Sequence, residues 1–381
     1  MVRDAIHGGI ELNELEEKIL DSLEMQRLRG IKQLAMAYLV YPSANHSRFE
    51  HSLGTFHLTS KLCERLSFQL GQDEVQLLRL SALLHDVGHG AFSHLSEPLL
   101  IEKTGKNHEQ LGIEKIKSGK IGEEIEKAGY SISELEKIMS GKDSRGMIVH
   151  SDLGTDRMDY LLRDAYFCGV AYSVIDAERL LETLQFRDGE LLVGEKGRLA
   201  AESLLVSRYL MFNSVYFHHA VRIAQEMCKK AIRSSLEKGD IKLEDITEED
   251  DAFLLNKMLK AKNPLARCLS ERRLFKRAFV LDSSLPQHAE FFGDGARALK
   301  KTESAVSKGC GEGEFIVSMP AVHSRPIDFK LLDEGGEAHP LKKTSAIARA
   351  VEREKKEDEL IIACAAENAD AVAKKAASLF G

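Results

Sequence analysis

The stretch that decides the fold is Leu84-His85-Asp86-Val87-Gly88-His89-Gly90-Ala91-Phe92-Ser93-His94. The residues before it, 74–84, are apolar on most faces and follow a plausible N-cap at Asp73. They therefore predict a buried helix, which this stretch brings to an end. Two glycines follow and stop this helix. Unpaired polar groups are costly at a buried helix end, so His85 and Asp86 need partners there. A bound metal ion would satisfy both side chains, and a helix end that reaches solvent would do so equally well.

Histidines crowd around this stretch. Seven of the 14 histidines fall within residues 46–108, where uniform scatter would place about 2. They are His46, His51, His57, His85, His89, His94 and His108. Imidazole and carboxylate groups are the usual protein ligands of zinc, iron, manganese and similar ions. The excess therefore indicates a metal site in this part of the chain.

A second group of candidate residues lies in a predicted helix over residues 47–70, whose apolar residues recur at helical spacing. Arg48 and His51 are three residues apart and share one face of that helix. His51 could supply an imidazole ligand to a metal ion, and Arg48 could clamp a phosphate. Taken alone, the pair is more typical of a surface arginine beside a capped histidine.

A third group lies on a predicted helix over residues 152–165. Asp156, Tyr160 and Asp164 follow one another at intervals of four residues and form a drifting stripe on one face. Asp156 could be a remote carboxylate ligand, with Tyr160 and Asp164 pointing along the same cleft toward a substrate. On spacing alone, an amphipathic surface helix with charge pairs four residues apart is the more typical explanation.

The overall pattern predicts a mainly α protein, a multi-helix core with a small α/β (or α+β) domain at the C-terminal end. Residues 1–280 form the predicted helical domain, with every motif inside 1–230, and residues 285–381 form the second domain, whose role is open. The helical part includes a long helix over 199–230 and a hairpin with a tight turn at Asp188-Gly189. Further predicted elements are a connector at 283–286, strands at 314–319 and 359–364, and a helix at 368–379.

Composition excludes several classes of protein. The 381 residues are 43% hydrophobic and 30% charged, which is ordinary for a folded soluble chain and excludes a disordered one. A net charge of −7 argues against nucleic acid as a partner, and the basic run 272–277 is more typical of a solvated helix face. No apolar stretch approaches 18 residues and no signal core opens the chain, so we expect no membrane partner. Six cysteines without a CxxC pair are expected to be reduced thiols, and the cytoplasm is the expected location.

Taken together, ordered motifs over residues 1–230 resemble the HD-domain phosphohydrolases. Within that superfamily the chain is similar to the branch of the SAM-and-HD-domain dNTP triphosphohydrolases and their dGTPase-like prokaryotic relatives. The motifs are Asp4-Ala5-Ile6-His7-Gly8, residues 26–34, Ser47-Arg48-Phe49-Glu50-His51-Ser52-Leu53-Gly54, residues 84–94, His108-Glu109-Gln110 and Asp156-Arg157-Met158-Asp159-Tyr160. The resemblance implies a helical HD core and a metal-dependent hydrolase that acts on phosphoester bonds.

The resemblance also implies a ligand set and a cofactor. The metal ligands would be His51, His85, Asp86 and Asp156. The cofactor would be a divalent metal ion, with manganese, iron, zinc, nickel and magnesium all open. An additional magnesium ion could arrive with the nucleotide.

Further residues receive catalytic and substrate-binding roles from the resemblance. The catalytic group would be His94, His108, His89 and Glu97. One of the first two histidines would protonate the leaving oxygen, and His89 would face the phosphates. The substrate-binding group would be Gln33, Leu34, Arg48, Arg157, Tyr160 and Asp164. Arg48 would contact the phosphate under attack, while Gln33 and Leu34 would read the sugar.

Two positions depart from the family pattern. Glu97 stands where the vertebrate enzyme has an aspartate, three residues after the catalytic histidine, and its longer side chain could still orient a histidine. Val215 stands where the vertebrate enzyme has a phosphate-binding arginine, so Arg208 or Arg222 could hold the triphosphate instead. Base preference and triphosphate preference are therefore open.

The function expected from these residues is hydrolysis of a deoxynucleoside triphosphate to deoxynucleoside and triphosphate. Two alternatives stay open: an HD phosphohydrolase of other specificity, acting on a monophosphate, GTP or a guanosine alarmone, and a nucleotide-sensing protein with slow turnover. The expected partners are the nucleotide substrate and further copies of the chain, in a dimer or tetramer. The basic residues Arg27, Arg29 and Lys32, or the run 272–277, are candidates for an allosteric nucleotide site or a subunit interface.

Overall fold

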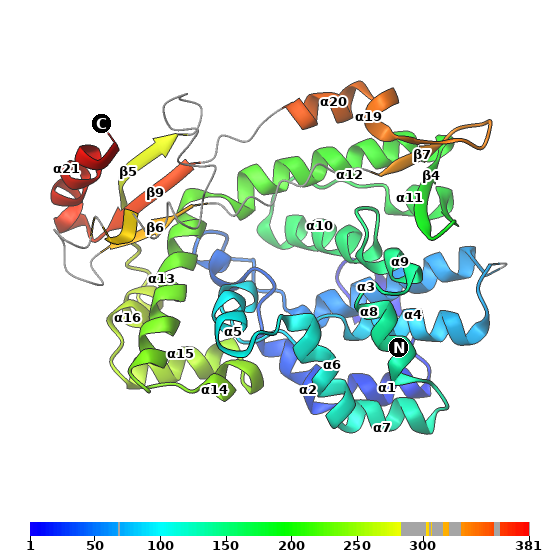
Figure 1. Cartoon of the computed structure of the whole chain (residues 1–381), viewed down its shortest axis with the longest axis horizontal. Helices are drawn as coiled ribbons and strands as arrows, with labels where there is room; N and C mark the ends of the chain where they lie inside the picture. Colours follow the sequence, from blue (N-terminus) through cyan, green and yellow to red (C-terminus); the bar gives the residue numbers. More distant parts are fainter. Residues whose placement is uncertain are drawn as a thin grey trace.

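The computed structural model describes residues 1–67, 69–282, 302–304, 306, 315–319, 329–353 and 359–380. Helices make up most of this part of the chain, as predicted, and the strands form small sheets (Figure 1). Up to residue 183 the α-helices are α1 (Glu14–Leu20), α2 (Leu23–Arg27), α3 (Arg48–Arg65), α4 (Gln72–Leu84), α5 (Glu97–Thr104), α6 (His108–Ser118), α7 (Lys120–Lys127), α8 (Ile132–Met139), α9 (Met147–His150), α10 (Thr155–Cys168) and α11 (Ala177–Thr183). Short 3-10 turns cover Leu28–Gly30, Ala35–Leu39, Ser93–Leu95, Ser144–Gly146, Glu195–Gly197 and Ala366–Asn368. None of the described helices combines the length and apolar character that crossing a membrane requires.

Helix α3 packs against both α4 and α10 (Figure 1). Its side chains Phe49, Leu53 and Phe56 are buried, and α4 carries buried leucines on most faces, as the sequence predicts. Burial of each such side chain stabilises the fold by roughly 1.5–3 kcal/mol. This packing places the first turns of α3 and α10 beside the C-terminal end of α4, where the histidine-rich stretch begins.

The ends of three helices differ from the predicted ones by a few residues. Helix α4 begins at Gln72, and its N-cap is Gly71 rather than Asp73. The reason is that the carboxylate of Glu74 turns back and accepts the Gly71 backbone N–H at 2.8 Å. Helix α3 ends early, at Arg65, and α10 is shifted by a few residues toward the C-terminus.

The long helix predicted over residues 199–230 is interrupted. It consists of α12 (Arg198–Met211), a π-helical turn (Phe212–Tyr216) and α13 (His219–Glu237). The hydroxyl of Tyr41 donates to the Ser214 carbonyl at 2.5 Å, and the hydroxyl of Tyr216 donates to Asp164 at 2.6 Å. These bonds hold the turn to segments that are distant in the sequence, so helical periodicity alone does not reveal the interruption.

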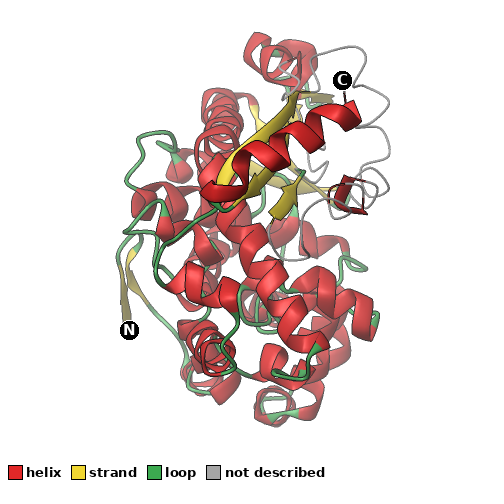
Figure 2. Cartoon of the chain, turned by 90° about the vertical axis from the view of Figure 1, so that its left-hand side faces the viewer, coloured by secondary structure: helices red, strands yellow, loops and turns green. Residues whose placement is uncertain are grey.

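One tail sheet has the strand order β5-β9-β6, with both pairs antiparallel. Its strands are β5 (Lys276–Asp282), β6 (Phe315–Ser318) and β9 (Glu359–Cys364). Helix α21 (Ala369–Phe380) packs on this sheet next to the C-terminus (Figure 2). Helix α13 contacts β6. The strand and helix predictions for the tail are confirmed within the described residues, whereas the connector at 283–286 and Glu314 lie outside them.

The basic run 272–277 is not a helix face, which corrects that prediction. The helices before it are α14 (Leu243–Glu248), α15 (Asp251–Lys260) and α16 (Pro264–Ser270). Arg272 lies in a turn with a φ of +53°, and Lys276 and Arg277 begin strand β5. The run becomes a strand because β5 pairs with β9, a partner far along the chain.

A second sheet joins the helical part to the tail, with the strand order β3-β4-β7-β8. The predicted hairpin is confirmed as β3 (Leu184–Arg187) and β4 (Glu190–Gly194). Asp188 and Gly189 both have positive φ, at +54° and +78°, as a tight Asp-Gly turn requires. Strand β7 (Lys330–Leu332) pairs in parallel with β4, and β8 (Ala338–Pro340) is antiparallel to β7.

The remaining elements lie at the two ends of the helical part. Helices α19 (Leu341–Thr344) and α20 (Ala346–Arg353) follow β8, and α20 packs against α12 (Figure 1). At the N-terminus, β1 (Val2–Asp4) and β2 (Gly8–Ile10) form a separate hairpin. The β4–β7 pairing crosses the boundary between the predicted domains 1–280 and 285–381, and that division stays a prediction.

Candidate metal centre

Three segments converge at the end of α4. His85 and Asp86 directly follow that helix, His51 lies in the first turns of α3, and Asp156 lies in the first turn of α10. His51, His85 and Asp86 are buried, with exposed fractions of 1%, 7% and 3%. The packing of α3 against α4 and α10 therefore brings the four predicted metal ligands together.

The ligand atoms of these four residues face one another. The Nε2 atom of His51 lies 2.9 Å from Oδ1 of Asp156 and 3.3 Å from Nε2 of His85. The Nε2 atom of His85 lies 3.4 Å from Oδ1 of Asp86 and 3.9 Å from Oδ1 of Asp156. Neighbouring ligands of one ion, each bound at about 2.0–2.2 Å, are separated by roughly 3 to 3.5 Å. The ligand atoms of His51, His85 and Asp86 all lie within 4.8 Å of one another, as a metal-binding group requires, and Asp156 lies beside this group, against the two histidines.

The hydrogen bonds of the two histidine rings make the same point. Nδ1 of His85 donates to the Ala82 carbonyl at 2.8 Å, and Nδ1 of His51 donates to Asp159 at 2.7 Å. When the Nδ1 atom carries the proton, the Nε2 atom of a neutral ring carries a lone pair. Without an ion His51 is protonated and its Nε2 donates to Asp156. Loss of that proton would leave two Nε2 lone pairs facing each other, an arrangement that a cation between them would stabilise.

Charge at this site also calls for a cation. Burial lowers the pKa of His51, but hydrogen bonds to Asp156 and Asp159 outweigh it and raise that pKa to about 10. Burial raises the pKa of Asp156, but the hydrogen bond from His51 outweighs it and lowers that pKa to about 2. The carboxylates are thus compensated by a positive charge on His51, and a divalent ion would supply the same compensation.

Asp159 supports the site from behind. Besides His51, it accepts hydrogen bonds from Nε2 of His7 at 2.6 Å and from two nitrogens of Arg163 at 2.9 Å each. Arg163 in turn donates to Asp4 at 2.9 Å. None of Asp4, His7, Asp159 and Arg163 is among the predicted site residues. The sequence signals for them are the N-terminal motif, which contains Asp4 and His7, the Asp156–Tyr160 motif, which contains Asp159, and the opposite charges of Asp159 and Arg163 four residues apart.

Arg48 contacts both the metal candidate Asp86 and Ser93 in the loop that follows α4. Its Nη1 donates to Asp86 at 2.6 Å, and its Nε donates to the Ser93 hydroxyl at 2.7 Å. Its Nη2 is buried and has no hydrogen-bond partner in the described part of the chain. Because a buried donor without an acceptor is costly, this atom is suited to receive an anionic oxygen next to the metal candidates.

Glu97 links two of the predicted catalytic histidines. Its carboxylate lies 2.9 Å from Nδ1 of His94 and makes a short hydrogen bond with Nδ1 of His108. Burial raises the pKa of Glu97, but the bonds with His108 and His94 outweigh it and hold that pKa far below the usual range. The ionised carboxylate therefore fixes both rings through Nδ1, which leaves the Nε2 atoms for other partners. The His94 side chain is 63% exposed and is open to a ligand.

His89 fills the space between the two clusters. Its ring stacks on His108 with centroids 3.9 Å apart, and its Nε2 lies 3.3 Å from Oδ1 of Asp86. Neither ring nitrogen has a hydrogen-bond partner among the described residues. Burial, followed by the charges of Arg48 and His108, holds the pKa of His89 well below its usual value. His89 is therefore a neutral, unsatisfied imidazole beside the metal candidates.

A group of charged side chains lies on the α10 side of the site. Arg157 contacts Asp152, and Nη1 of Arg208 lies 3.9 Å from the same carboxylate. The Tyr160 ring packs edge-on near His51, with centroids 6.4 Å apart. Two of the predicted substrate residues, Arg157 and Tyr160, thus adjoin Arg208, one of the two arginines proposed to hold a triphosphate.

Arg222, the other arginine proposed for the triphosphate, has a different position. It is buried and donates to the Ser318 hydroxyl at 3.2 Å and to the backbone carbonyls of Ser318 and Glu359. These bonds attach α13 to the tail sheet, so its guanidinium is committed to the fold and the expectation for this residue is wrong. Val215 is fully buried in the π-helical turn.

The remaining predicted substrate residues differ in how freely they could meet a ligand. Both oxygens of Asp164 are engaged, one with His46 at 2.7 Å and one with Tyr216 at 2.6 Å. The Oε1 atom of Gln33 has no hydrogen-bond partner within the described residues. Leu34 is half-buried against the main core. Gln33 therefore has a free acceptor, whereas Asp164 is part of a closed buried network.

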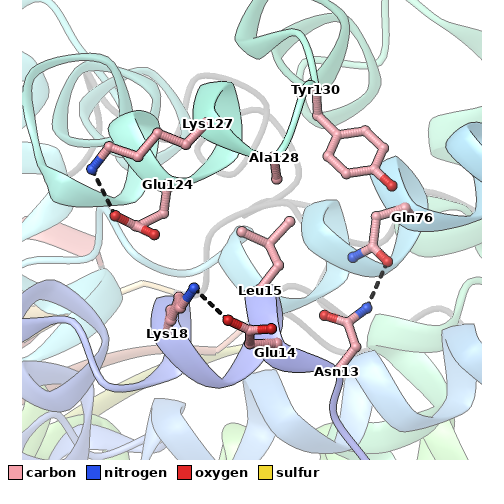
Figure 3. Close-up of a pocket in the computed structure, with 9 residues that line it drawn as sticks. All are labelled: Asn13, Glu14, Leu15, Lys18, Gln76, Glu124, Lys127, Ala128 and Tyr130. Carbon is pink, nitrogen blue, oxygen red and sulfur yellow. Dashed lines mark hydrogen bonds and ion pairs between the residues drawn. The ribbon is translucent and has the colours of Figure 1, made fainter.

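A separate surface cavity of about 390 Å³ lies between α1, α4 and α7 (Figure 3). Its charged side chains are paired with each other, Lys18 with Glu14 at 2.7 Å and Lys127 with Glu124 at 2.9 Å. None of the predicted site residues lines it. The chemistry-bearing groups are thus gathered at the end of α4 and not in this cavity.

Two family matches cover most of the chain. Residues 48–164 match the HD domain, and residues 175–381 match the HD associated region. All four metal candidates lie within the first match.

Three relatives illustrate the similarity. An uncharacterized protein of Methanocaldococcus jannaschii is 42% identical over 280 residues, 72% of this chain and 58% of that protein. The deoxynucleoside triphosphate triphosphohydrolase SAMHD1 homolog of Dictyostelium discoideum is 29% identical over 67% of this chain and 52% of that protein. The crystal structure of a hypothetical protein from Aquifex aeolicus has a TM-score of 0.79 and 30% identity, covering 98% of each chain. The chain thus spans little more than half of the two curated relatives and nearly all of the solved structure.

Proposed function

The chain belongs to the HD domain family, whose members are metal-dependent phosphohydrolases, and from this premise we propose that it hydrolyses deoxynucleoside triphosphates to deoxynucleoside and triphosphate. The observation that carries the proposal is the facing set of His51, His85, Asp86 and Asp156, with the unpartnered Nη2 of Arg48 beside it. Such a set can hold an ion and a phosphate oxygen next to each other.

The four residues His51, His85, Asp86 and Asp156 would hold a divalent ion, whose identity among manganese, iron, zinc, nickel and magnesium stays open. When bound there, the ion supplies Lewis acidity toward a phosphoryl oxygen and makes water more acidic. Asp159 accepts the Nδ1 proton of His51, so that Nε2 would be the atom that binds the ion. Arg48 donates from Nη2 to an oxygen of the α-phosphate and stabilises the negative charge that grows on it during attack.

Protonation of the leaving 5′-oxygen falls to the histidines that Glu97 holds. His94 is the better candidate of the two because its side chain is 63% exposed, against 21% for His108. In its charged form His94 would donate from Nδ1 to Glu97 and give its Nε2 proton to the leaving oxygen, after which the ring is neutral. His89 lies between this pair and the metal candidates, where it would meet the phosphates.

Sugar and phosphate contacts complete the proposal. Gln33 and Leu34 would read the sugar, and the free Oε1 of Gln33 would accept from its 3′-hydroxyl. Arg157 and Tyr160 would line the nucleotide, with Asp164 held by His46 and Tyr216 in the buried network described above. Arg208 is the candidate for the outer phosphates. The proposed setting is cytoplasmic, in a homo-oligomer such as a dimer or tetramer. The similarity to the deoxynucleoside triphosphate triphosphohydrolase SAMHD1 homolog of Dictyostelium discoideum supports the choice of deoxynucleoside triphosphates as substrates.

One observation favours a second candidate, hydrolysis of a nucleotide with a shorter phosphate chain. Asp152 contacts Arg157 and lies 3.9 Å from Arg208, so one negative charge already offsets these two arginines. Val215 adds no charge at its position. A monophosphate needs fewer cationic partners than a triphosphate does.

The test is an incubation of metal-supplemented protein with a panel of deoxynucleotides and ribonucleotides, followed by chromatography of the products. We expect deoxynucleoside and intact triphosphate, and no product from the Asp86→Ala variant, which also loses its bound metal. Orthophosphate or pyrophosphate would assign the protein to the second candidate. Full activity of Asp86→Ala or His85→Ala would contradict the metal assignment itself.

A further inference from the structure

Two loops meet beside the metal candidates. One, residues 30–34, carries the sugar-reading candidates, and the other, residues 87–95, carries His89, Ser93 and His94. Asp251, in the first turn of α15, touches both. Its Oδ1 accepts the Phe92 backbone N–H at 2.6 Å, and its Oδ2 accepts the Lys32 backbone N–H at 3.0 Å. One carboxylate therefore joins the two loops.

The segment that leads into α15 supports the same loops. The Ile246 carbonyl accepts the Ala91 N–H at 2.8 Å. Arg27 donates from Nη1 to the Glu249 carbonyl at 3.1 Å and from Nη2 to the His89 carbonyl at 2.6 Å. Residues 246–251 are thus hydrogen-bonded to the loop of residues 87–95, directly and through Arg27. Asp251 is the residue of this segment that also bonds the loop of residues 30–34.

The catalytic loop needs this support because its backbone is strained. Phe92 and Ser93 have φ values of +61° and +54°, in the left-handed region that non-glycine residues rarely occupy. Ser93 accepts from Arg48 and donates from its hydroxyl to the Lys32 carbonyl at 2.9 Å. Asp251 thus bonds Phe92 and Lys32, while Ser93, the neighbour of Phe92, bonds Lys32 as well. The conformation of Ser93 and the orientation of Arg48 therefore depend on the relative position of the two loops.

We propose that Asp251 is a positioning residue of this site: it holds the loop of Gln33 and Leu34 in register with the loop of Ser93 and His94, and thereby sets selectivity for the sugar. This inference rests on the proposed function. Backbone bonds join Gln33 to His46 and Ile31 to Arg48, and the Asp251 bond to Lys32 adds the link to the loop of Ser93. Loss of the Asp251 bond would therefore shift Gln33 relative to that loop without removing any metal ligand.

The chemistry of the side chain explains how one residue holds both loops. Burial raises the pKa of Asp251 to about 6, although the backbone hydrogen bonds act in the opposite direction. An asparagine would avoid the cost of a buried charge, but it has one acceptor oxygen, and its NH2 group would face a second N–H donor. Only a carboxylate accepts both N–H groups at this place.

The first test compares Asp251→Asn with Asp250→Ala. Asp250 is the N-cap of the same helix and accepts the Phe253 N–H at 2.8 Å. Its side chain packs against Gly30 but bonds neither the Phe92 nor the Lys32 N–H, so it controls for loss of a neighbouring carboxylate. For Asp251→Asn we expect kcat/KM on the deoxynucleoside triphosphate to fall at least tenfold, the preference over the matching ribonucleotide to shrink, and metal content to stay unchanged. For Asp250→Ala we expect a lower Tm with the preference retained. A folded Asp251→Asn variant with unchanged sugar preference would overturn the proposal.

The second test needs neither a folded variant nor turnover. In hydrogen–deuterium exchange of the wild-type protein, the amides of Phe92 and Lys32 should exchange as slowly as those of the buried helix α4. Exchange at the rate of exposed loops would overturn the proposal even if the protein hydrolyses deoxynucleotides. If the wild type hydrolyses none, the proposed function fails, while slow exchange would still support Asp251 as the link between the loops.

Discussion

At the scale of single residues, Asp159 shows how much of a metal site lies behind its ligands. It touches no predicted substrate residue, yet it accepts from His51, His7 and Arg163 at once. Burial raises its pKa, but the charge of Arg163 and the hydrogen bonds outweigh it and hold the pKa well below the usual value. A permanent negative charge thus fixes the tautomer of His51.

Asp159→Asn should therefore weaken metal binding without removing a ligand. The amide keeps the size of the side chain but loses the charge, so we expect affinity for a divalent ion to fall about 10- to 100-fold. Titration of the metal-free protein, followed by calorimetry, measures this. Asp73→Asn, at an exposed position in α4, is the control and should bind as the wild type does. Equal affinities for both variants would contradict the supporting role of Asp159.

His94→Ala should separate turnover from metal binding. If Glu97 holds His94 as the proton donor, its loss should reduce kcat by about 10²- to 10⁴-fold while metal content stays at the wild-type level. Metal analysis and product chromatography on the same sample measure both quantities. Loss of the metal would instead identify His94 as a ligand and contradict its assignment as acid.

His57 should make stability depend on pH. Burial, followed by repulsion from His7 and Lys61, lowers the pKa of His57 to about 4, whereas an unfolded histidine titrates near about 6.5. As pH falls from about 6.5 to about 4, the unfolded chain takes up a proton that the folded chain resists, so the free energy of unfolding decreases. Urea unfolding of metal-free protein should show a smaller decrease for His57→Gln. Parallel profiles for the two proteins would refute this assignment.

The ligand candidates can be predicted from the sequence because they occur in short ordered motifs. Asp159 stands three residues after Asp156 in one such motif, but its role depends on His7, which is 152 residues away in the sequence. Likewise, nothing near Asp251 in the sequence indicates that its carboxylate reaches Lys32 and Phe92. The residues that hold the ligand side chains in place do so through tertiary contacts. Such contacts cannot be deduced from a single sequence without its fold.

At the scale of elements, the buried helix α4 and the β3–β4 hairpin follow from local pattern, since an apolar run and an Asp-Gly turn each specify a structure on their own. The π-helical turn does not. It depends on hydroxyls of Tyr41 and Tyr216 that bond to groups distant in the sequence. Strand β5 depends in the same way on β9, which is why its first basic residues resemble a helix face.

Tyr216→Phe should destabilise the turn measurably. The change leaves one oxygen of buried Asp164 without its donor, which costs about 1–3 kcal/mol in the free energy of unfolding. Chemical denaturation monitored by circular dichroism measures the loss. Tyr166→Phe, at a side chain that is 61% exposed, should stay within about 0.5 kcal/mol of the wild type. A loss of similar size in both variants would mean that the Tyr216 bond contributes nothing specific.

At the scale of the whole molecule, a net charge of −7 coexists with a site rich in arginine. Arg48 and Arg208 lie near the metal candidates, and Asp86 and Asp152 offset part of their charge. The sign of the net charge of the chain therefore does not predict the charge of the ligand that one site binds. The tail is attached by a different arginine, Arg222, through its bonds to β6 and β9.

Arg222→Met should loosen the tail sheet and leave the metal site intact. Removing the guanidinium leaves the carbonyls of Ser318 and Glu359 without this hydrogen-bond donor. We therefore expect faster proteolysis in the tail at unchanged metal content. Limited proteolysis with mass spectrometry locates the first cuts. Arg233→Met, on the same helix, removes only an exposed pair with Glu102 and should be cut at the wild-type rate. Equal rates for both variants would contradict the anchoring role of Arg222.

The parallel pairing of β4 with β7 has a consequence for the order of assembly during synthesis. The residues that surround the metal candidates, from α3 to α10, leave the ribosome well before β7 does, because β4 ends at Gly194 and β7 begins at Lys330. At about 5–20 residues per second, translation of the intervening chain takes roughly 7–27 s. The formation of a helix takes far less time than that. The helices from α3 to α10 can therefore pack together while the edge of β4 that later pairs with β7 is still free, so that the tail strand is added to a helical part that is already formed.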